Sequence, residues 1–249
     1  MIEVRNLKKN FGTQRVLDGV NLRIEKGESI VIIGRSGGGK SVLLKQLIGL
    51  NKPDSGQVLI EDHDIVPMNE RQLLEVRRKF GMLFQGAALF DSMSVAENIA
   101  FPLRWDKTLT AKDVRDRVSE ALDVVDLPGT ETKKPSELSG GMKKRVGLAR
   151  AIIYQPQIVL YDEPTTGLDP VVSDSIDKLI IRVRDHLKVT TVVVTHDMRS
   201  ARRVGQRILY LLNKVIYTSG TAEEIFTSTD PLVRKFIDGV ADPKEHHNF

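Results

Sequence analysis

The chain has 249 residues, 41% hydrophobic and 28% charged, which is ordinary for a globular protein with one large domain or a core carrying an insertion. Its 37 basic and 33 acidic residues give a net charge of +4, too small to favour a nucleic-acid partner but compatible with work near anionic lipid. The absence of cysteine excludes disulfides and thiolate metal sites and suits a reducing cytosol.

The first 24 residues predict strands, because apolar and polar residues alternate and turn residues follow at Asn10, Gly12 and Gly27. The same alternation does not match a signal peptide. Phe11 lies in the predicted turn, where it either covers a small core or stacks on a purine base. No apolar run approaches the roughly 20 residues that cross a bilayer, so we expect another subunit to do the crossing if the protein works at a membrane.

Residues 34–41 read GRSGGGKS and join a β-branched run at 29–33 to a helical segment at 42–48. This is the context of a phosphate-binding loop, in which glycines let backbone N–H groups and a helix N-terminus surround an anion. Lys40 is expected to reach the β- and γ-phosphates, and the Ser41 hydroxyl to bind Mg²⁺. The predicted loop residues are Gly34, Arg35, Ser36, Gly37, Gly38, Gly39, Lys40, Ser41 and Val42.

Residues 80–84 predict a buried strand that ends at Gln85, whose amide is a candidate contact for a metal or water. The stretch 86–103 is unusually apolar for loop-bounded sequence, so it is either a docking surface or the small core between two lobes. Capping boxes begin the next helices, at Ser94 with Glu97 and at Thr110 with Asp113.

Acidic and imidazole side chains follow two later strands. Asp162 and Glu163 end the apolar run 158–161, and His196 follows the strand 190–194. After a phosphate loop, such a pair predicts an Asp that holds Mg²⁺ and a Glu that activates water. The imidazole of His196 is expected to bind the γ-phosphate or the water, because open α/β sheets place ligands at strand carboxyl ends.

Strands that alternate with helices predict an α/β fold. We expect a core with an antiparallel β lobe from residues 1–85 and 156–220, a helical subdomain at 86–155, and two helices with a flexible tail at 221–249. The first of these last helices has a capping box of Thr221 with Glu224. The tail Ala241–Phe249 is polar.

The motif Leu138-Ser139-Gly140-Gly141 opens a basic helix and is a second candidate anion site. Together with GRSGGGKS, Gln85, IVLYDEP, the segment 167–169 and the segment 195–197, it makes the chain resemble the ATP-binding subunit of an ABC transporter, from Phe11 to about Gly220.

The resemblance implies a P-loop ATPase that works as a head-to-tail pair of copies. Ser139, Gly140 and Gly141 would contact ATP held by the partner's Lys40, and Asp169 would lie at the dimer interface. It also implies adenine stacking on Phe11, catalytic roles for Glu163, His196 and Gln85, and ATP and Mg²⁺ as cofactors. The residues implied to be near the metal are Ser41, Gln85 and Asp162.

Two departures narrow the resemblance, since Met142 stands where Gln is usual in the signature and Val42 where Thr or Ser is usual. The chain looks like a member of the Mla or Mce-associated branch in three segments, 142–150, 81–92 and 95–99. Members of that branch drive phospholipid movement between inner and outer membranes. That branch implies a location on the cytoplasmic face of the inner membrane and a periplasmic Mce-domain subunit. It also implies a membrane permease docked near three apolar residues, Leu89, Phe90 and Met93.

Three alternatives remain open. The first is an importer of another solute such as an amino acid, from which Met142 distinguishes the chain. The second is a non-transport ABC ATPase, disfavoured because the chain has one cassette and no heptad run. The third is a nucleotide-binding subunit without turnover, disfavoured because both Glu163 and His196 are present.

Overall fold

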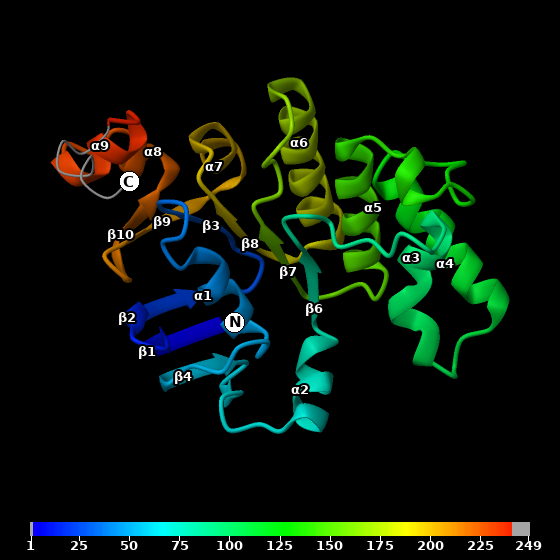
Figure 1. Ribbon diagram of the computed structural model, residues 1–249, viewed down its shortest axis with the longest axis horizontal. Coiled ribbons are helices and arrows are strands. Elements are labelled where there is room, and N and C mark those ends of the chain that lie inside the picture. The colour runs from blue at the N-terminus through cyan, green and yellow to red at the C-terminus, as the bar shows by residue number, and fades with distance from the viewer. Residues whose placement is uncertain (1, 241–249) are drawn as a thin grey trace.

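The structure is a computed structural model that describes residues 2–240, and within them helices pack around the larger of two β-sheets while the smaller sheet lies at one side (Figure 1). The strands are β1 (Ile2–Phe11), β2 (Gln14–Ile24), β3 (Ser29–Ile33), β4 (Ser55–Ile60), β5 (His63–Asp64), β6 (Phe80–Leu83), β7 (Ile158–Asp162), β8 (Thr190–Thr195), β9 (Arg207–Leu212) and β10 (Val215–Thr221). The α-helices are α1 (Lys40–Leu47), α2 (Glu70–Arg77), α3 (Val95–Ala100), α4 (Ala111–Val124), α5 (Gly140–Ile152), α6 (Pro170–Leu187), α7 (Met198–Val204), α8 (Ala222–Phe226) and α9 (Pro231–Ile237). Two 3₁₀ helices, η1 (Phe101–Trp105) and η2 (Pro135–Glu137), complete the described elements.

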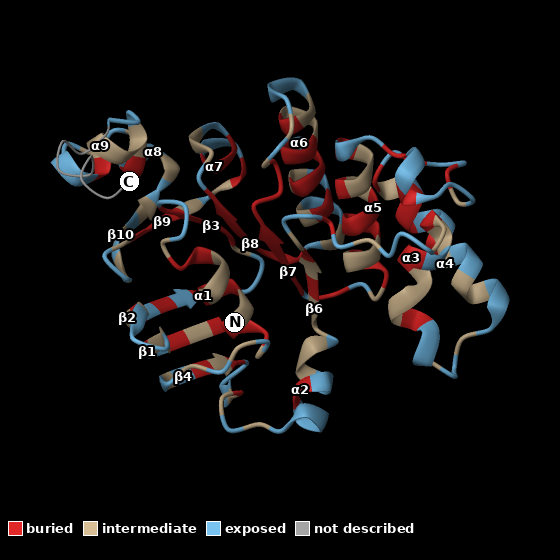
Figure 2. Ribbon diagram, viewed as in Figure 1, coloured by how far each residue is buried: buried red, intermediate tan, exposed pale blue. Residues whose placement is uncertain are grey.

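The larger sheet has the order β10-β9-β3-β8-β7-β6, with β9, β3, β8, β7 and β6 parallel and β10 antiparallel to β9. Every residue of β3, β7 and β8 is buried, and these strands are red at the centre of Figure 2. Continuous burial explains their β-branched, uninterrupted apolar sequence, because a parallel sheet is covered on both faces.

Alternate residues of these strands enter two separate cores. Val31 and Ile33 point into a core shared with α3 to α9, whereas Ile30 and Ile32 point into a core shared with α1, α2 and the smaller sheet. This division follows from the two-residue period of a strand. The α/β fold predicted from the sequence is therefore confirmed.

The smaller sheet, of order β2-β1-β4-β5, is wholly antiparallel and is the expected N-terminal β lobe. Phe11 is the last residue of β1, where it pairs with Gln14, so the prediction that it lies in the turn itself was wrong. Gly12, with φ 57°, makes the turn with Thr13 instead.

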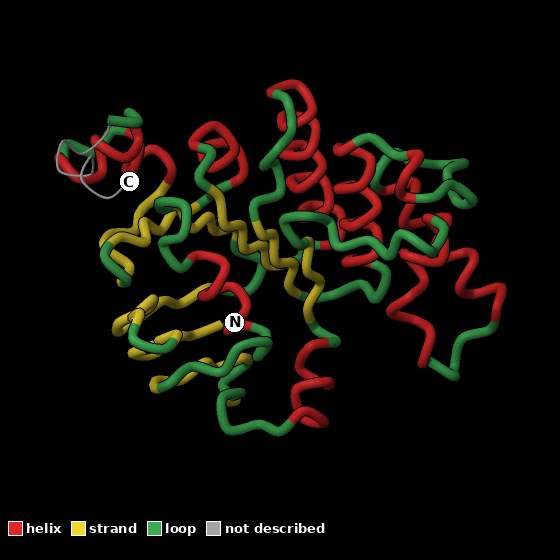
Figure 3. Tube along the Cα trace, viewed as in Figure 1, coloured by secondary structure: helices red, strands yellow, loops and turns green. Residues whose placement is uncertain are grey.

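Helices and loops alone make up the described segment 86–155, which lies beside α6 at the far end of the large sheet (Figure 3). The predicted capping boxes of α3, α4 and α8 are confirmed. Helices α5 and α6 are capped by Ser139 and Asp169, whose side chains accept hydrogen bonds from the N–H groups of their first turns. The division of the chain at 86 and 155 stays a prediction.

The apolar stretch 86–103 was interpreted either as a docking surface or as the small core between two lobes, and its residues differ in burial. Ile99 is fully buried in the core, whereas Phe90 is 40% exposed and stands over Phe101 at 4.6 Å between ring centroids. Leu89 and Met93 are half-buried. The stretch therefore contributes both to the core and to the surface.

Helices α8 and α9 follow β10, and the predicted flexible tail Ala241–Phe249 lies outside the described residues. None of the helices within residues 2–240 has both the length and the apolar character needed to span a membrane.

Asn98 of α3 ties the preceding loop to the helical segment. Its Oδ1 accepts from the N–H of Phe90 at 2.8 Å, and its Nδ2 donates to the carbonyls of Phe90, Met93 and Ser94 at 3.1, 3.3 and 3.0 Å. The side chain is fully buried. The loop 90–94 is therefore held by one buried amide.

We expect Asn98→Ala to lower the free energy of unfolding by at least about 2 kcal/mol, because each buried polar group left unpaired costs about 1–3 kcal/mol. Urea denaturation with an unchanged m-value measures the loss. Ser92→Ala in the same loop is the control, because Ser92 accepts from Lys134 through its backbone carbonyl, which the substitution keeps. A decrease below about 0.5 kcal/mol for Asn98→Ala, the ordinary range of surface changes, contradicts the expectation.

Candidate nucleotide-binding site

The loop between β3 and α1 has the conformation of an anion cradle. Gly39 precedes α1 with φ 98°, and no side chain caps that helix. A Cβ at Gly39 would also meet Val16 and Leu17 at 3.1 Å, so both conformation and space require glycine there. The N–H groups of the first turn of α1 are thus oriented toward an incoming anion.

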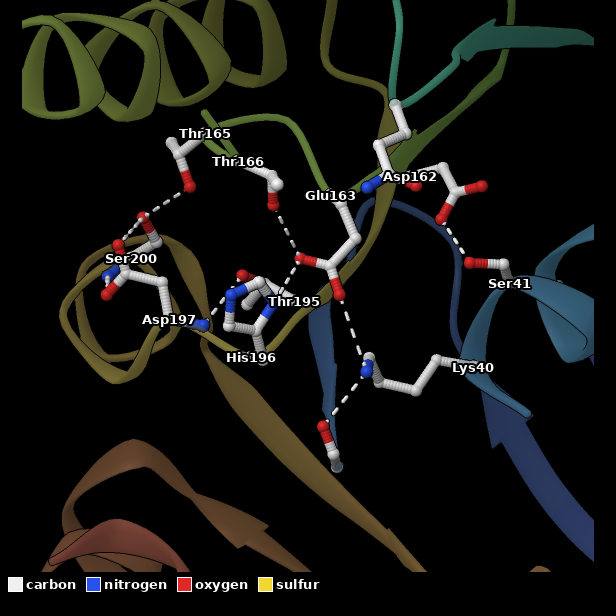
Figure 4. Close-up of polar contacts among 12 residues, drawn as sticks. Lys40, Ser41, Asp162, Glu163, Thr165, Thr166, Thr195, His196, Asp197 and Ser200 are labelled. Atoms are coloured by element: carbon white, nitrogen blue, oxygen red, sulfur yellow. Dashed lines mark hydrogen bonds and ion pairs between the residues drawn. The ribbon is translucent and has the colours of Figure 1, made fainter. Parts of the chain in front are cut away.

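Lys40 is the first residue of α1 and is 4% exposed. Its ammonium donates to the carbonyls of Gly34 and Arg35 at 2.9 and 3.0 Å, and lies 3.4 Å from Oε1 of Glu163. These contacts fold the side chain back over the loop, and its ammonium lies between backbone carbonyls of the loop and the Glu163 carboxylate (Figure 4).

Ser41 in the first turn of α1 and Asp162 at the end of β7 meet side chain to side chain. The Ser41 hydroxyl donates to Oδ1 of Asp162 at 2.6 Å, and Asp162 is 4% exposed. A hydroxyl and a carboxylate are the hard oxygen ligands that Mg²⁺ prefers. In the described part of the chain no group of three His, Cys, Asp or Glu side chains could hold a metal, so a metal here would depend on phosphate and water for its other ligands.

Glu163 adopts the left-handed conformation with φ 49°, held by its N–H bond to the carbonyl of Val194 at 3.0 Å. Its Oε2 lies 2.8 Å from Nδ1 of His196 and accepts from the hydroxyl of Thr166 at 3.1 Å. With Oε1 near Lys40, the carboxylate is fixed on both oxygens (Figure 4). A carboxylate held this way can take a proton from water at a defined position.

These residues line a groove of about 430 Å³. It brings together most of the predicted site residues: Phe11, Ser36, Gly37, Gly38, Gly39, Lys40, Ser41, Val42, Gln85, Glu163 and His196. Gly34 and Arg35 do not line it but supply the carbonyls that hold Lys40. Asp162 lies beneath it, against Ser41. Phe11 is 48% exposed at the rim and has the Lys9 ammonium 5.4 Å from its ring centroid.

The signature residues lie outside this groove. Ser139 accepts from the N–H of Met142 at 3.3 Å and so caps α5. A Cβ at Gly141 would meet the side chain of Val172 in α6 at 2.6 Å, so this glycine is required by packing within the chain. Asp169 caps α6 beside them. Their action across a dimer stays a prediction.

Four residues at or near the site were not predicted from the sequence: Gln14, Val16 and Thr166, which line the groove, and Lys144 beside it. Thr166 bonds the carboxylate of Glu163, and Lys144 of α5 donates to the carbonyls of Gln85 and Glu163. Thr166 follows the acidic pair by only three residues, which is a usable signal. Lys144 has none, because in a basic helix it reads as a solvent-facing residue.

Comparison with known proteins agrees with this geometry. The family model described as ABC transporter matches residues 17–166, more than half of the chain. The chain belongs to the ABC transporter family. The match spans the phosphate loop, the signature and the acidic strand end, and the chain is accordingly an ATP-binding transport ATPase.

Two curated relatives are similar over nearly the whole chain. The probable ribonucleotide transport ATP-binding protein mkl of Mycobacterium leprae is 45% identical over 96% of this chain and 69% of that protein. The intermembrane phospholipid transport system ATP-binding protein MlaF of Haemophilus influenzae is 38% identical over 97% of this chain and 92% of that protein.

Among solved structures, the ATP-binding cassette MJ0796 has a TM-score of 0.82 and 33% identity, over 89% of this chain and 99% of that chain. That structure is a dimer in a post-hydrolysis state, bound to ADP and Pi. The ABC ATPase fold with an antiparallel lobe is therefore confirmed.

We expect Lys40→Ala to weaken ATP binding about 10–100-fold, because a charge-assisted hydrogen bond contributes about 1.5–3 kcal/mol. Titration calorimetry with ATP measures the affinity. Lys45→Ala in the last turn of the same helix is the matched control and should bind like the unaltered protein. Equal affinities of the two variants would show that Lys40 does not contact the phosphates.

Proposed function

We propose that the protein is the ATPase of a phospholipid transporter of the Mla type, in which two copies enclose ATP and drive a membrane permease. The main support for ATP hydrolysis is the position of Glu163, whose carboxylate is fixed between Lys40, Thr166 and His196. The assignment of phospholipid as the substrate rests on the similarity to MlaF over most of both chains.

In the proposed reaction Glu163 accepts a proton from the water that attacks the γ-phosphate. Lys40 and the α1 N-terminus stabilise the charge that develops on the phosphate oxygens. His196 holds the carboxylate in place and lines the groove that would receive the γ-phosphate. Bound Mg²⁺, held by Ser41 and Asp162 with Gln85 beside it, would supply further charge neutralisation.

The groove of one chain is completed by the signature of another. Support comes from the separation within the chain, since Ser139, Gly140 and Gly141 cap and open α5 but do not line the groove. Further support is that the similar cassette MJ0796 is a dimer with ADP and Pi. In this arrangement Asp169, beside the signature, lies at the dimer interface.

The membrane permease docks on Leu89, Phe90 and Met93. Phe90 is 40% exposed and Arg150 lies 5.9 Å from its ring centroid, so an apolar surface is presented beside a cation. This surface follows Gln85 closely in the chain, which connects it to the nucleotide groove. The complex would lie on the cytoplasmic face of the inner membrane, with an Mce-domain subunit on the periplasmic side.

A second candidate substrate, a ribonucleotide, follows from the 45% identity to mkl. The two candidates differ in what the purified complex carries, because a lipid transporter retains extractable phospholipid. Organic extraction followed by mass spectrometry of the complex from native membrane separates them. Ribonucleotide bound apart from the ATP site, without phospholipid, would favour the second candidate.

Glu163→Gln should reduce ATP hydrolysis about 10²–10⁴-fold, the usual contribution of a general base, and leave ATP binding intact. Phosphate release and ATP titration measure the two properties. Glu120→Gln on the exposed face of α4 is the matched control. Turnover of Glu163→Gln within a few-fold of the unaltered protein would exclude the proposed base.

Phe90→Asp should give a folded, ATP-binding subunit that no longer copurifies with an integral membrane subunit, because a charge replaces apolar area worth about 25 cal/mol per Å² on burial. Affinity purification from detergent-solubilised native membrane, with subunit and phospholipid analysis, measures assembly.

Leu74→Asp on α2 is the control, because Leu74 is a similarly exposed apolar residue at 57% and lies on a different element. If Phe90→Asp stays assembled, the permease docks elsewhere. If it unfolds, Phe90 belongs to the core.

A further inference from the structure

Lys144 is a buried cation in the second turn of α5, with 6% of its surface exposed. Its ammonium donates to the backbone carbonyl of Glu163 at 3.2 Å and to the backbone carbonyl of Gln85. One side chain of the signature helix thus contacts the backbone at two of the proposed catalytic residues of its own chain.

Keeping an ammonium group at this position has an energetic cost. Burial lowers the pKa of Lys144, and the charges of Asp162 and Glu163 act in the opposite direction. An apolar side chain of the same length would fill the space without removing a charge from water. Packing alone therefore does not account for a lysine here.

The contact with Glu163 falls on a strained part of the backbone. Glu163 has φ 49°, a conformation that costs a residue other than glycine about 1–2 kcal/mol. Its carbonyl also accepts from the N–H of Thr166 at 3.4 Å, a long bond. The ammonium of Lys144 adds a charge-assisted bond to the same carbonyl and so opposes relaxation of the turn.

The contact with Gln85 is part of a wider attachment to α5. Ala87 and Ala88 follow with φ 60° and 49°, and their carbonyls accept from Arg150 at 2.7 and 2.8 Å. Between the two cations Gly147 allows close approach, since a Cβ there would meet Ala87 at 3.2 Å. Segment 85–88 is therefore held from one face of α5.

We propose that Lys144 is a positioning residue for ATP hydrolysis, which fixes the Glu163 turn and the Gln85 backbone to the signature helix of the same chain. A displacement of α5 then moves the carboxylate and the amide together. The inference rests on the roles proposed above for Glu163 and Gln85.

The test compares three substitutions in the full-length protein. Lys144→Met removes the donor at similar length, Lys144→Gln keeps a shorter neutral donor, and Lys144→Arg keeps a charged donor. Lys112→Met, on the exposed face of α4 in the helical segment, is the control for loss of a lysine. Steady-state hydrolysis gives kcat and KM for ATP, and thermal unfolding reports folding.

We expect Lys144→Met to lower kcat at least about tenfold with KM changed less than about threefold, since positioning acts on the chemical step and not on binding. Lys144→Arg should recover kcat to within about threefold of the unaltered protein. A folded Lys144→Met with kcat within about twofold, or with its loss confined to KM, overturns the proposal.

If Lys144→Met does not fold, the other two variants decide. Lys144→Arg must then exceed Lys144→Gln in kcat by at least about threefold, and equal rates overturn the proposal. Glu163→Gln, measured in the same assay, distinguishes a failure of the proposed role of Glu163 from a failure of the proposed role of Lys144. If Glu163→Gln remains active, the proposed role of Glu163 fails. If Glu163→Gln is inactive while Lys144→Met is fully active, only the role of Lys144 fails.

Discussion

The parallel register of β3, β8 and β7 is the constraint on which the site depends. Ile33 pairs with Thr195, and Asp162 with Val194, so the carboxyl ends of all three strands reach the same edge of the sheet. The residues that follow each strand therefore converge, although Ser41 and Asp162 are 121 positions apart in sequence and Glu163 and His196 are 33 apart. A shift of one strand by one residue would turn its side chains to the opposite face and separate the groups.

The buried charges at this edge are close to balanced. Lys40 and Lys144 face Asp162 and Glu163, and all four side chains are less than a tenth exposed. A polyphosphate would add negative charge to a cluster that is already neutral. The helix terminus would offset part of that charge, and the remainder supports the proposal that Mg²⁺ binds together with the nucleotide.

Local patterns predicted much of this molecule. The phosphate loop, the buried strands and three capping boxes depend on residues that are neighbours in sequence, and all have the expected places. The convergence of Glu163 with His196 followed from the rule that ligands lie at strand carboxyl ends. Fold and groove could therefore be predicted from the sequence.

Contacts between distant segments could not be predicted. Lys144 meets Gln85 across 59 positions, and Asn98 meets the backbone of Phe90 around a loop whose path depends on packing. The turn position of Phe11 was wrong because pairing with Gln14 extends β1 by one residue beyond the sequence pattern. In each case the residue that makes the contact is brought into place by tertiary structure, which local sequence patterns do not encode.

The buried amide of Asn98 has a consequence for assembly with a partner. Because Phe90, Met93 and Ser94 are already fixed by its hydrogen bonds, the permease proposed to dock there would meet a preorganised surface. Little conformational entropy is then lost on contact, so a small apolar area can give a stable interface. If the permease docks there as proposed, the same rigidity would let motion of the helical segment reach it without being absorbed by the loop between them.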